Sequence, residues 1–297
     1  MKLNEEKGLC GCVILNYNDS NTTINLVNKI KEYSSIDYII IVDNFSLDDS
    51  YANLLELESA KIKLVKTEKN GGYGYGNNIG VQYAYERLKC KYVLIANPDV
   101  IFENVLVENM LKCMKQDLKI AVVAPTQLDI NGNYIRDRAW KIPTITQYIF
   151  SAEMIIGKYT RHFHYPDEMF WQMGDKEVDC VPGSLLLVRA RVFMEVNGFD
   201  QEMFLFCEET TLAKKLKDKK YRTILIDDTY IHQHSISINR SIRKVSKQRQ
   251  LLLNSRYVFM KKYLYANKWQ LLLAKGWYAL ALLESVVIET IKGKKLV

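Results

Sequence analysis

Carboxylates that could do chemistry stand where three predicted buried segments end. Asp43 closes the run YIIIVD, Asp99 follows KYVLIANP, and the pair Glu208–Glu209 follows GFDQEMFLFC. A carboxylate can accept the imide proton of uracil or thymine, ligate Mg²⁺ or Mn²⁺ beside a phosphate, or serve as a general base. Asp is also a turn former, and acids also stabilise helix starts. The fold must decide whether these groups meet.

The first half of the chain predicts the elements that would bring them together. Near-continuous Val/Ile/Leu runs alternate with amphipathic segments, which indicates βα units and a doubly wound, mostly parallel α/β sheet. In such a sheet ligands bind beyond the carboxyl ends of the strands. Those ends carry three polar groups of residues: Asn16-Tyr17, Asp43-Asn44, and Asn97-Pro98-Asp99.

A glycine-rich segment, KNGGYGYGNNIG at residues 69–80, lies between a predicted strand and a predicted helix. The dinucleotide fingerprint GxGxxG fails here, because counting from Gly72 puts Asn77 at the third glycine position. The P-loop GxxxxGK[ST] fails as well, because Asn77-Asn78 replace its lysine and hydroxyl. We therefore expect a loop whose glycines let the backbone approach a ligand, with Asn77 and Asn78 supplying polar contacts.

The second half is less regular. An Asn-Gly pair in LDINGNYIR predicts a hairpin, residues 140–178 permit no assignment, and VDCVPGSLLLVRA and RTILIDD are predicted strands. The last sixty residues are helical and basic, and their apolar stretch from Trp269 is interrupted by Lys275 and Glu284. This tail could pack on the domain, lie on a membrane or pair with a second chain.

Bulk properties exclude several classes of protein. The 297 residues carry a net charge of +7, which suits an anionic ligand, a membrane surface or a nucleic acid. The sequence holds no RNA- or DNA-binding motif, so no nucleic-acid partner is expected. Six scattered cysteines form no CxxC pair, and the N-terminal segment has no long apolar run. These features predict a reduced, cytoplasmic location.

Six motifs in order resemble family 2 glycosyltransferases with the GT-A fold, most closely a rhamnosyltransferase-like branch. They are VILNYN, IVDNFSLDDS, NGGYGYGNNIG, LIANPDV, VPGSLLLVRARVFMEVNGFD and FLFCEETTL. The resemblance covers residues 10 to about 240. It implies a GT-A domain over 1–240, with a nucleotide-sugar half at 1–127, an acceptor and catalytic half at 128–240, and a basic helical extension at 241–297.

The resemblance also implies roles for single residues. Asp43 would bind the base, Asn97 and Asp99 the metal-diphosphate, and His232, from an H-x-x-x-x-S pattern, would join the metal site. The family's catalytic base maps to Glu209, preceded by Glu208, while Thr211 replaces an aspartate of the family motif. The other expected donor-binding residues are Asn16, Tyr17, Asn44, Gly72, Asn77 and Asn78.

The implied activity is an inverting transfer from a nucleoside-diphosphate sugar, dTDP-rhamnose or a UDP-sugar, to a hydroxyl of a glycan or lipid-linked glycan in surface polysaccharide synthesis. A Mg²⁺ or Mn²⁺ ion would assist. The alternative is a catalytically degenerate module that binds a nucleotide sugar, which the Thr211 departure favours. The expected partners of the C-terminal helices are a membrane, placing the protein peripherally on its inner face, or a second copy of the chain.

Overall fold

The computed structural model describes residues 8–135, 137–152, 163–233 and 244–293. The described strands form one nine-stranded sheet in the order β3-β2-β1-β4-β8-β6-β9-β5, with β7 paired to β9. The strands are β1 (Cys10–Asn16), β2 (Tyr38–Asp43), β3 (Ile62–Lys66), β4 (Tyr92–Ala96), β5 (Val100–Ile101), β6 (Ile120–Leu128), β7 (Lys176–Val178), β8 (Leu185–Arg189) and β9 (Arg222–His232).

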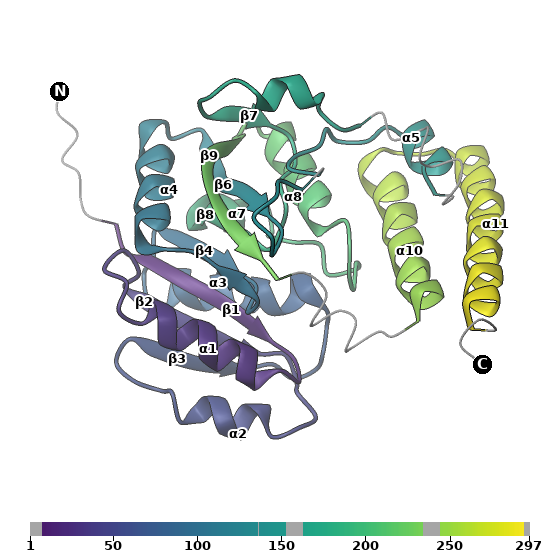
Figure 1. Ribbon diagram of the computed structural model, residues 1–297. Coiled ribbons are helices and arrows are strands. Elements are labelled where there is room, and N and C mark those ends of the chain that lie inside the picture. Colours follow the sequence, from purple (N-terminus) through teal and green to yellow (C-terminus); the bar gives the residue numbers. More distant parts are fainter. Residues whose placement is uncertain (1–7, 136, 153–162, 234–243, 294–297) are drawn as a thin grey trace.

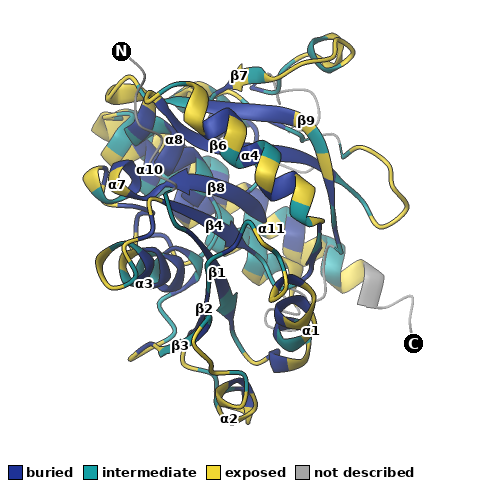
Figure 2. Ribbon diagram, turned by 90° about the vertical axis from the view of Figure 1, so that its left-hand side faces the viewer, coloured by how far each residue is buried: buried dark blue, intermediate teal, exposed yellow. Residues whose placement is uncertain are grey.

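Helices cover both faces of this sheet, which explains why its central strands are apolar throughout (Figure 2). On one face, α1 (Ser20–Ile30), α2 (Ser50–Leu55) and α4 (Asn104–Gln116) bury residues in a shared core. On the other face, α3 (Tyr73–Glu86), α7 (Ala190–Glu195) and α8 (Glu208–Asp218) form a second core. The predicted doubly wound, mostly parallel sheet is therefore confirmed.

Strand β8 runs against its neighbours in the middle of the sheet, and the short strands β5 and β7 are antiparallel to β9. β8 is antiparallel to both β4 and β6, while β1, β2, β3 and β4 pair in parallel. Ala96 at the end of β4 stands opposite Leu185 at the start of β8. The reversal therefore brings the segment before β8 to the edge where the parallel strands end.

The glycine-rich segment differs from the expectation. Helix α3 begins at Tyr73, so Gly74, Gly76, Asn77 and Asn78 lie in its first turns and not in an open loop. Two glycines of the segment, Gly76 and Gly80, lie directly against strand β1. A Cβ on Gly76 would stand 2.2 Å from Leu15 Cδ1, and one on Gly80 2.4 Å from Val13 Cγ1, so the missing side chains let α3 pack directly on β1.

The second half supplies irregular connections. The predicted Asn131-Gly132 turn is present, although one isolated bridge between Leu128 and Tyr134 takes the place of a longer hairpin ladder. The segment without an assignment contains α5 (Ile145–Phe150), a 3₁₀ turn (Asp167–Phe170) and β7. A capping box between Thr144 and Gln147 fixes the start of α5.

The C-terminal extension is two helices, α10 (Val245–Tyr263) and α11 (Lys268–Gly293), which lie side by side next to the sheet domain (Figure 1). They share a third core with α5 and with residues just before α8, including Met203 and Cys207. The predicted helical extension is confirmed, and its first helix packs against the segment that leads to Glu208 and Glu209.

Candidate functional site

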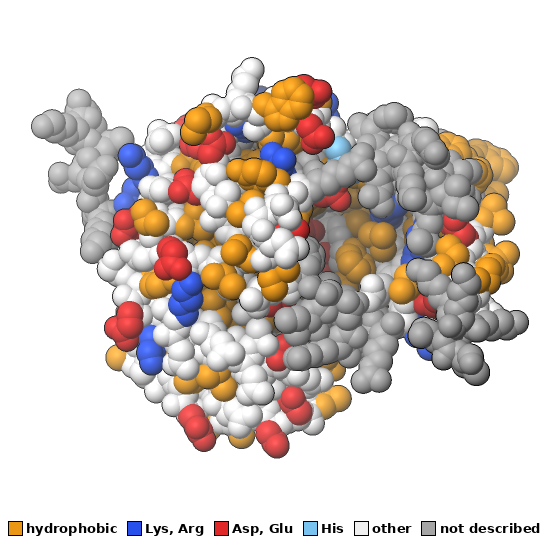
Figure 3. All heavy atoms as spheres, viewed as in Figure 1, with side chains coloured by type: hydrophobic (Ala, Val, Ile, Leu, Met, Phe, Trp, Pro, Cys, Tyr) orange, Lys and Arg blue, Asp and Glu red, His pale blue; other side chains and the backbone are white. Residues whose placement is uncertain are grey.

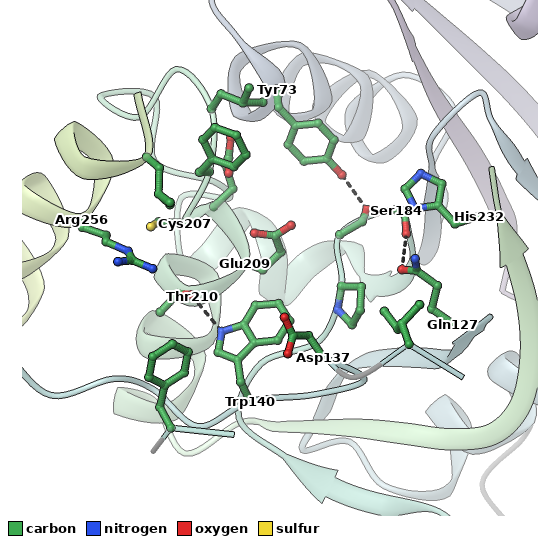
Figure 4. Close-up of a pocket in the computed structure, with 18 of the residues that line it drawn as sticks. Tyr73, Gln127, Asp137, Trp140, Ser184, Cys207, Glu209, Thr210, His232 and Arg256 are labelled. Atoms are coloured by element: carbon green, nitrogen blue, oxygen red, sulfur yellow. Dashed lines mark hydrogen bonds between the residues drawn. The ribbon is translucent and has the colours of Figure 1, made fainter. Parts of the chain in front are cut away.

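A cavity of about 460 Å³ lies beside the carboxyl ends of the strands and extends to α10. One side, here called the strand-end wall, consists of Asn97, Gln127, Ser184 and His232. The opposite side, the helical wall, consists of Trp140, Tyr148, Leu252 and Arg256. Glu209 lies between the two walls (Figure 4).

Hydrogen bonds join most of the strand-end wall. The Asn97 N–H donates to the Ser184 carbonyl (2.8 Å), and the Ser184 hydroxyl lies 2.5 Å from the Tyr230 hydroxyl. Both hydroxyls reach the Gln127 side-chain oxygen, at 3.2 and 3.1 Å. Gln127 Nε2 is buried and has no partner among the described residues, which leaves one donor for a ligand.

Asp99 and His232 meet although 133 positions separate them in the sequence. Strand β5 pairs with β9 so that Val100 stands opposite His232. Asp99 Oδ1 lies 3.1 Å from His232 Nε2, and both side chains are almost fully buried. His232 lines the cavity, while Asp99 lies behind it.

The Asp99–His232 pair fits a divalent cation as two of its ligands. Ligands about 2.1 Å from an octahedral ion stand about 3.0 Å apart along each edge, which matches the separation of these two atoms. Among the described residues no group of three or more His, Cys, Asp or Glu is arranged to hold a metal. The remaining ligands would therefore come from water and a bound phosphate, as Mg²⁺ commonly requires.

The predicted base-binding residues form a closed turn. Asn16 stands beside Asp43 in the β1–β2 ladder, and its Nδ2 donates to Asp43 Oδ1 at 3.0 Å. Asp43 Oδ2 accepts from the backbone of Ser46 at 3.2 Å, and the whole side chain is buried. Asn44 bonds to Asn70 and to the Gly72 carbonyl. These residues lie outside the cavity lining, as does the half-buried Tyr17.

The predicted donor contacts on α3 face the protein. Both atoms of the Asn78 amide bond the backbone of Phe199, at 2.9 and 2.8 Å. Asn77 is buried and donates to the Tyr73 carbonyl. Gly72 has φ = 88°, and a Cβ there would meet the Phe204 carbonyl oxygen at 2.0 Å. The glycine segment therefore supports the loop that precedes Glu208.

Glu208 and Glu209 occupy the first turn of α8 and differ in exposure. Glu209 is half-buried and lines the cavity, whereas Glu208 is 2% exposed and its Oε1 has no partner among the described residues. Gly183 lies so close that a Cβ on it would stand 2.4 Å from Glu209 Oε1. Tyr73 donates to the Gly183 carbonyl at 2.7 Å and holds this approach.

A strained turn aims the two glutamates. Phe206 and Cys207 both adopt left-handed φ values, 72° and 67°, which non-glycine residues rarely do in succession. Thr211 is wholly buried and donates to the Cys207 carbonyl at 2.7 Å, so it stabilises the turn from behind. The aspartate-to-threonine departure noted in the sequence thus falls on a residue that packs away from the cavity.

Burial raises the pKa of both carboxyl groups. For Glu209, burial acts against backbone N–H groups, including that of Gly183, which favour the carboxylate. For Glu208, burial is joined by the charge of Glu209, and its pKa lies well above the ordinary range. Glu209 in this environment is a stronger base than a solvated glutamate, which is the property a general base needs.

The helical wall presents aromatic surface and one cation. Trp140 donates from Nε1 to Thr210 at 3.2 Å and exposes a ring face to the cavity (Figure 4). Arg256 lies over the Tyr148 ring, 5.1 Å from its centroid. Trp140 lines the cavity, whereas Phe170 and Trp171 do not. Trp171 is 74% exposed.

Sequence reasoning missed several lining residues. They are Tyr73, Gln127, Asp137, Tyr148, Ser184 and Arg256. Gln127 lies near the carboxyl end of β6, so the rule that pointed to Asp43 and Asp99 could have found it. Ser184 precedes the reversed strand β8, so that rule does not reach it. Arg256 lies in a basic helix without any distinguishing pattern, and only its packing beside α8 places it in the cavity.

Comparison with protein families finds a match to the model described as glycosyl transferase family 2 over residues 12–196, more than half of the chain. The rhamnosyltransferase WbbL of Escherichia coli is 26% identical over 247 residues, 77% of this chain and 90% of that protein. The N-acetylglucosaminyl-diphospho-decaprenol L-rhamnosyltransferase of Mycobacterium tuberculosis is 22% identical over 66% of each chain.

Solved structures show the same fold at low identity. GalNAc-T7, crystallised with UDP, GalNAc and Mn²⁺, is 15% identical with a TM-score of 0.60, and the match covers 79% of this chain and 45% of that one. The mannosyltransferase PcManGT of Pyrobaculum calidifontis, in complex with GDP-Man and Mn²⁺, is 14% identical with a TM-score of 0.58. That match covers 97% of this chain and 80% of the mannosyltransferase.

Proposed function

Because this chain belongs to glycosyl transferase family 2, we propose that it moves a sugar, with inversion, from dTDP-rhamnose or a UDP-sugar to a hydroxyl of a lipid-linked glycan. The position of Glu209 carries the proposal. Its carboxylate lies in the cavity between a polar wall built by strand ends and an aromatic wall, and burial raises its pKa. Two of the relatives found, from Escherichia coli and Mycobacterium tuberculosis, are named rhamnosyltransferases, which supports rhamnose as the sugar.

Glu209 would act as the general base. Its carboxylate removes the proton of the acceptor hydroxyl, and that oxygen attacks the anomeric carbon from the face opposite the diphosphate. The C1–O bond to the diphosphate breaks as the new bond forms, so the configuration inverts. Tyr73 and Gly183 hold Glu209 in place, and Trp140 offers a ring on which the acceptor sugar stacks.

Asp99 and His232 would hold Mg²⁺ or Mn²⁺, which offsets the negative charge of the leaving diphosphate. Asn97, Ser184 and the free Gln127 Nε2 would bind donor oxygens on the same wall. Asp43 would read the base. Since its carboxylate is buried beneath Ser46, the turn at 44–46 must open for a nucleobase to reach it. Asn16, Tyr17, Asn44, Gly72, Asn77 and Asn78 would shape the donor site from outside the cavity.

A direct assay tests this proposal. Purified protein is incubated with dTDP-rhamnose or a UDP-sugar, with Mn²⁺ or Mg²⁺, and with a synthetic N-acetylglucosaminyl-diphosphate alkyl acceptor. We expect glycosylated product and release of dTDP or UDP that depends on Glu209. Nucleotide-sugar binding without any transfer or hydrolysis would instead support the degenerate binding module.

Helix α11 supports a membrane location for the acceptor. It is long and apolar enough to cross a membrane by composition, yet only 22% of its apolar window is buried. The apolar side chains along its outer face are 48–69% exposed (Figure 3, right edge). They are Trp269, Leu272, Leu273, Leu280, Leu283, Val286, Val287 and Ile291. The inner face packs on α5 and α10, so α11 would lie along a bilayer surface.

Charge favours an anionic bilayer over a second copy as the occupant of this face. Residues 241–297 contain twelve Lys or Arg and two Glu, a net charge of +10, whereas the whole chain carries +7. Residues 1–240 are therefore net negative. Two such basic tails would repel each other, but anionic lipids attract each basic group near the surface by about 1 kcal/mol. We place the protein at the cytoplasmic face of the membrane on this basis.

Flotation with vesicles tests the surface. The native chain should float with vesicles of phosphatidylglycerol and phosphatidylcholine and float less with phosphatidylcholine alone. The double variant Leu280→Gln/Leu283→Gln should stay at the bottom of the gradient. Leu118→Gln, which changes an equally exposed leucine in the sheet domain, is the control. A lipid-free dimer that the double variant abolishes would identify a second copy as the occupant.

A further inference from the structure

Arg256 is a charged group in the cavity that has no charged partner among the described residues. Its Nη1 lies 3.3 Å from both the carbonyl and the hydroxyl of Ser151, and its guanidinium lies over the Tyr148 ring. Its Nε is buried without a hydrogen-bond partner among the described residues. A guanidinium in a partly buried site is normally paired with an anion, because desolvation of an unpaired charge is costly.

Three carboxylates line the cavity, but Asp137 lies 3.1 Å from His164, and neither Glu208 nor Glu209 forms an ion pair with Arg256 among the described residues. The described ion pairs do not include Arg256, and it is the only Lys or Arg among the described residues that line the cavity. Glu209 lines the same cavity, but burial and backbone N–H groups set its pKa and Arg256 does not contribute. The guanidinium is therefore available to a ligand.

We propose that Arg256 binds a phosphate group of the acceptor. In this acceptor the phosphate stands between the sugar that Glu209 activates and a hydrophobic chain. This inference rests on the function proposed above and assigns the acceptor's phosphate to one residue. A guanidinium binds phosphate through two parallel N–H···O bonds, and Nε with one Nη supplies such a pair.

The surroundings match the rest of such an acceptor. Leu252 lies one helical turn before Arg256 on α10 and lines the cavity with Leu205 and Phe206. These side chains give apolar surface next to the cation. Helix α10 packs directly on α11, whose outer face is apolar. These groups would receive a sugar at Glu209, a phosphate at Arg256 and an alkyl chain over Leu252.

The alternative anion is the donor diphosphate, and geometry argues against it. Glu209 lies between Arg256 and His232 in the cavity (Figure 4). An inverting displacement places the acceptor and the leaving diphosphate on opposite sides of the anomeric carbon. Asp99 and His232, the proposed cation ligands, mark the side of the leaving group. Arg256 therefore lies on the acceptor side.

Binding of a minimal anionic amphiphile tests the assignment. The nucleotide site is first filled with UDP or dTDP and Mn²⁺. The protein is then titrated calorimetrically with decyl diphosphate or with neutral decyl glucoside, each below its micelle concentration. We expect decyl diphosphate to bind the native chain, decyl glucoside to bind far more weakly, and Arg256→Gln to lower the diphosphate affinity about tenfold or more.

Matched variants separate charge from structure. Lys261→Gln removes an exposed positive charge from the same helix and should leave binding within about twofold of native. Arg256→Lys keeps the charge but loses the fork, so it should bind with intermediate affinity. If the thermal transition shows that Arg256→Gln does not fold, the comparison of Arg256→Lys with the native chain decides whether Arg256 binds the diphosphate.

Three results would overturn the inference. They are equal diphosphate affinity in native and Arg256 variants, equal affinity of the native chain for both amphiphiles, and a loss of UDP or dTDP affinity in Arg256→Gln, which would assign the arginine to the donor. Failure of the proposed function has a different signature, because the native chain would then transfer no sugar in the direct assay, whatever its affinity for the amphiphiles.

Discussion

The two walls of the cavity are built on different principles. In the strand-end wall, Ser184, Tyr230 and Gln127 bond one another, and Asp99 bonds His232. In the helical wall, Trp140 and Tyr148 present ring surface, and Arg256 forms no ion pair within the described part of the chain. A preorganised polar wall suits a ligand that is always the same, such as a nucleotide diphosphate. An apolar wall with one cation suits an acceptor recognised by shape and a single charge.

Loss of the Glu209 carboxylate should have the largest effect on sugar transfer. The reason is that Glu209 lies between the two walls and acts where their ligands react. Glu209→Gln keeps the size of the side chain but removes the base, so transfer should fall by about 10²–10⁴-fold. Nucleotide affinity should stay near its native value, since neither wall is altered, and the thermal transition should not fall, since Glu209→Gln also removes a carboxyl group whose pKa burial raises. Rates of sugar transfer with the purified variant measure this, and near-native transfer would remove Glu209 from the mechanism.

Variants of the strand-end wall should impair donor binding alone. Asp99→Asn and His232→Gln should each lower Mn²⁺-dependent nucleotide affinity or transfer by about 10–100-fold. Binding of decyl diphosphate at the helical wall should not change. Calorimetry with UDP or dTDP at several Mn²⁺ concentrations checks this, and if both variants keep the native dependence of nucleotide affinity on Mn²⁺, the cation assignment is wrong.

The junction between the glycine segment and the loop before Glu208 can be tested with a glycine pair. Gly72 and Gly132 both have positive φ, but a Cβ on Gly72 meets the Phe204 carbonyl, whereas a Cβ on Gly132 meets nothing within 4 Å. Gly132→Ala should cost about 1 kcal/mol of unfolding free energy from backbone strain alone. Gly72→Ala should cost at least 1–3 kcal/mol more and also slow transfer.

Denaturant unfolding and transfer rates of both variants measure that difference. Equal destabilisation by the two alanines would show that the glycine segment does not brace the loop that carries the base.

Glu208 should have the smallest effect, seen in stability against pH. Its folded pKa is raised, so the native state holds a proton that the unfolded state releases, and stability falls as pH rises above the ordinary glutamate pKa. Glu208→Gln removes this penalty. It should raise the melting temperature by about 2–4 °C at pH 8 and by less at pH 5, where Glu208 is already protonated. If Glu208→Gln changes the melting temperature by the same amount at pH 5 and pH 8, the raised pKa of Glu208 is contradicted.

Local pattern was sufficient for the sheet and for part of the site. The Val/Ile/Leu runs define strands buried on both faces, and their ends place Asp43, Asn97 and Asp99 at one edge. The glycine segment misled as to structure, because five glycines in twelve residues suggest a loop. The helix forms there because these glycines let α3 approach β1 closely.

The sequence by itself therefore determined the parallel sheet, the strand-end carboxylates and the basic helical tail, since each depends on residues close together in the chain. Tertiary structure alone decided the reversal of β8, the meeting of Asp99 with His232, and the placement of Arg256 beside Glu209. These features join residues many positions apart. Nothing in the local spacing encodes such pairings, because they arise when whole elements pack to bury their apolar faces.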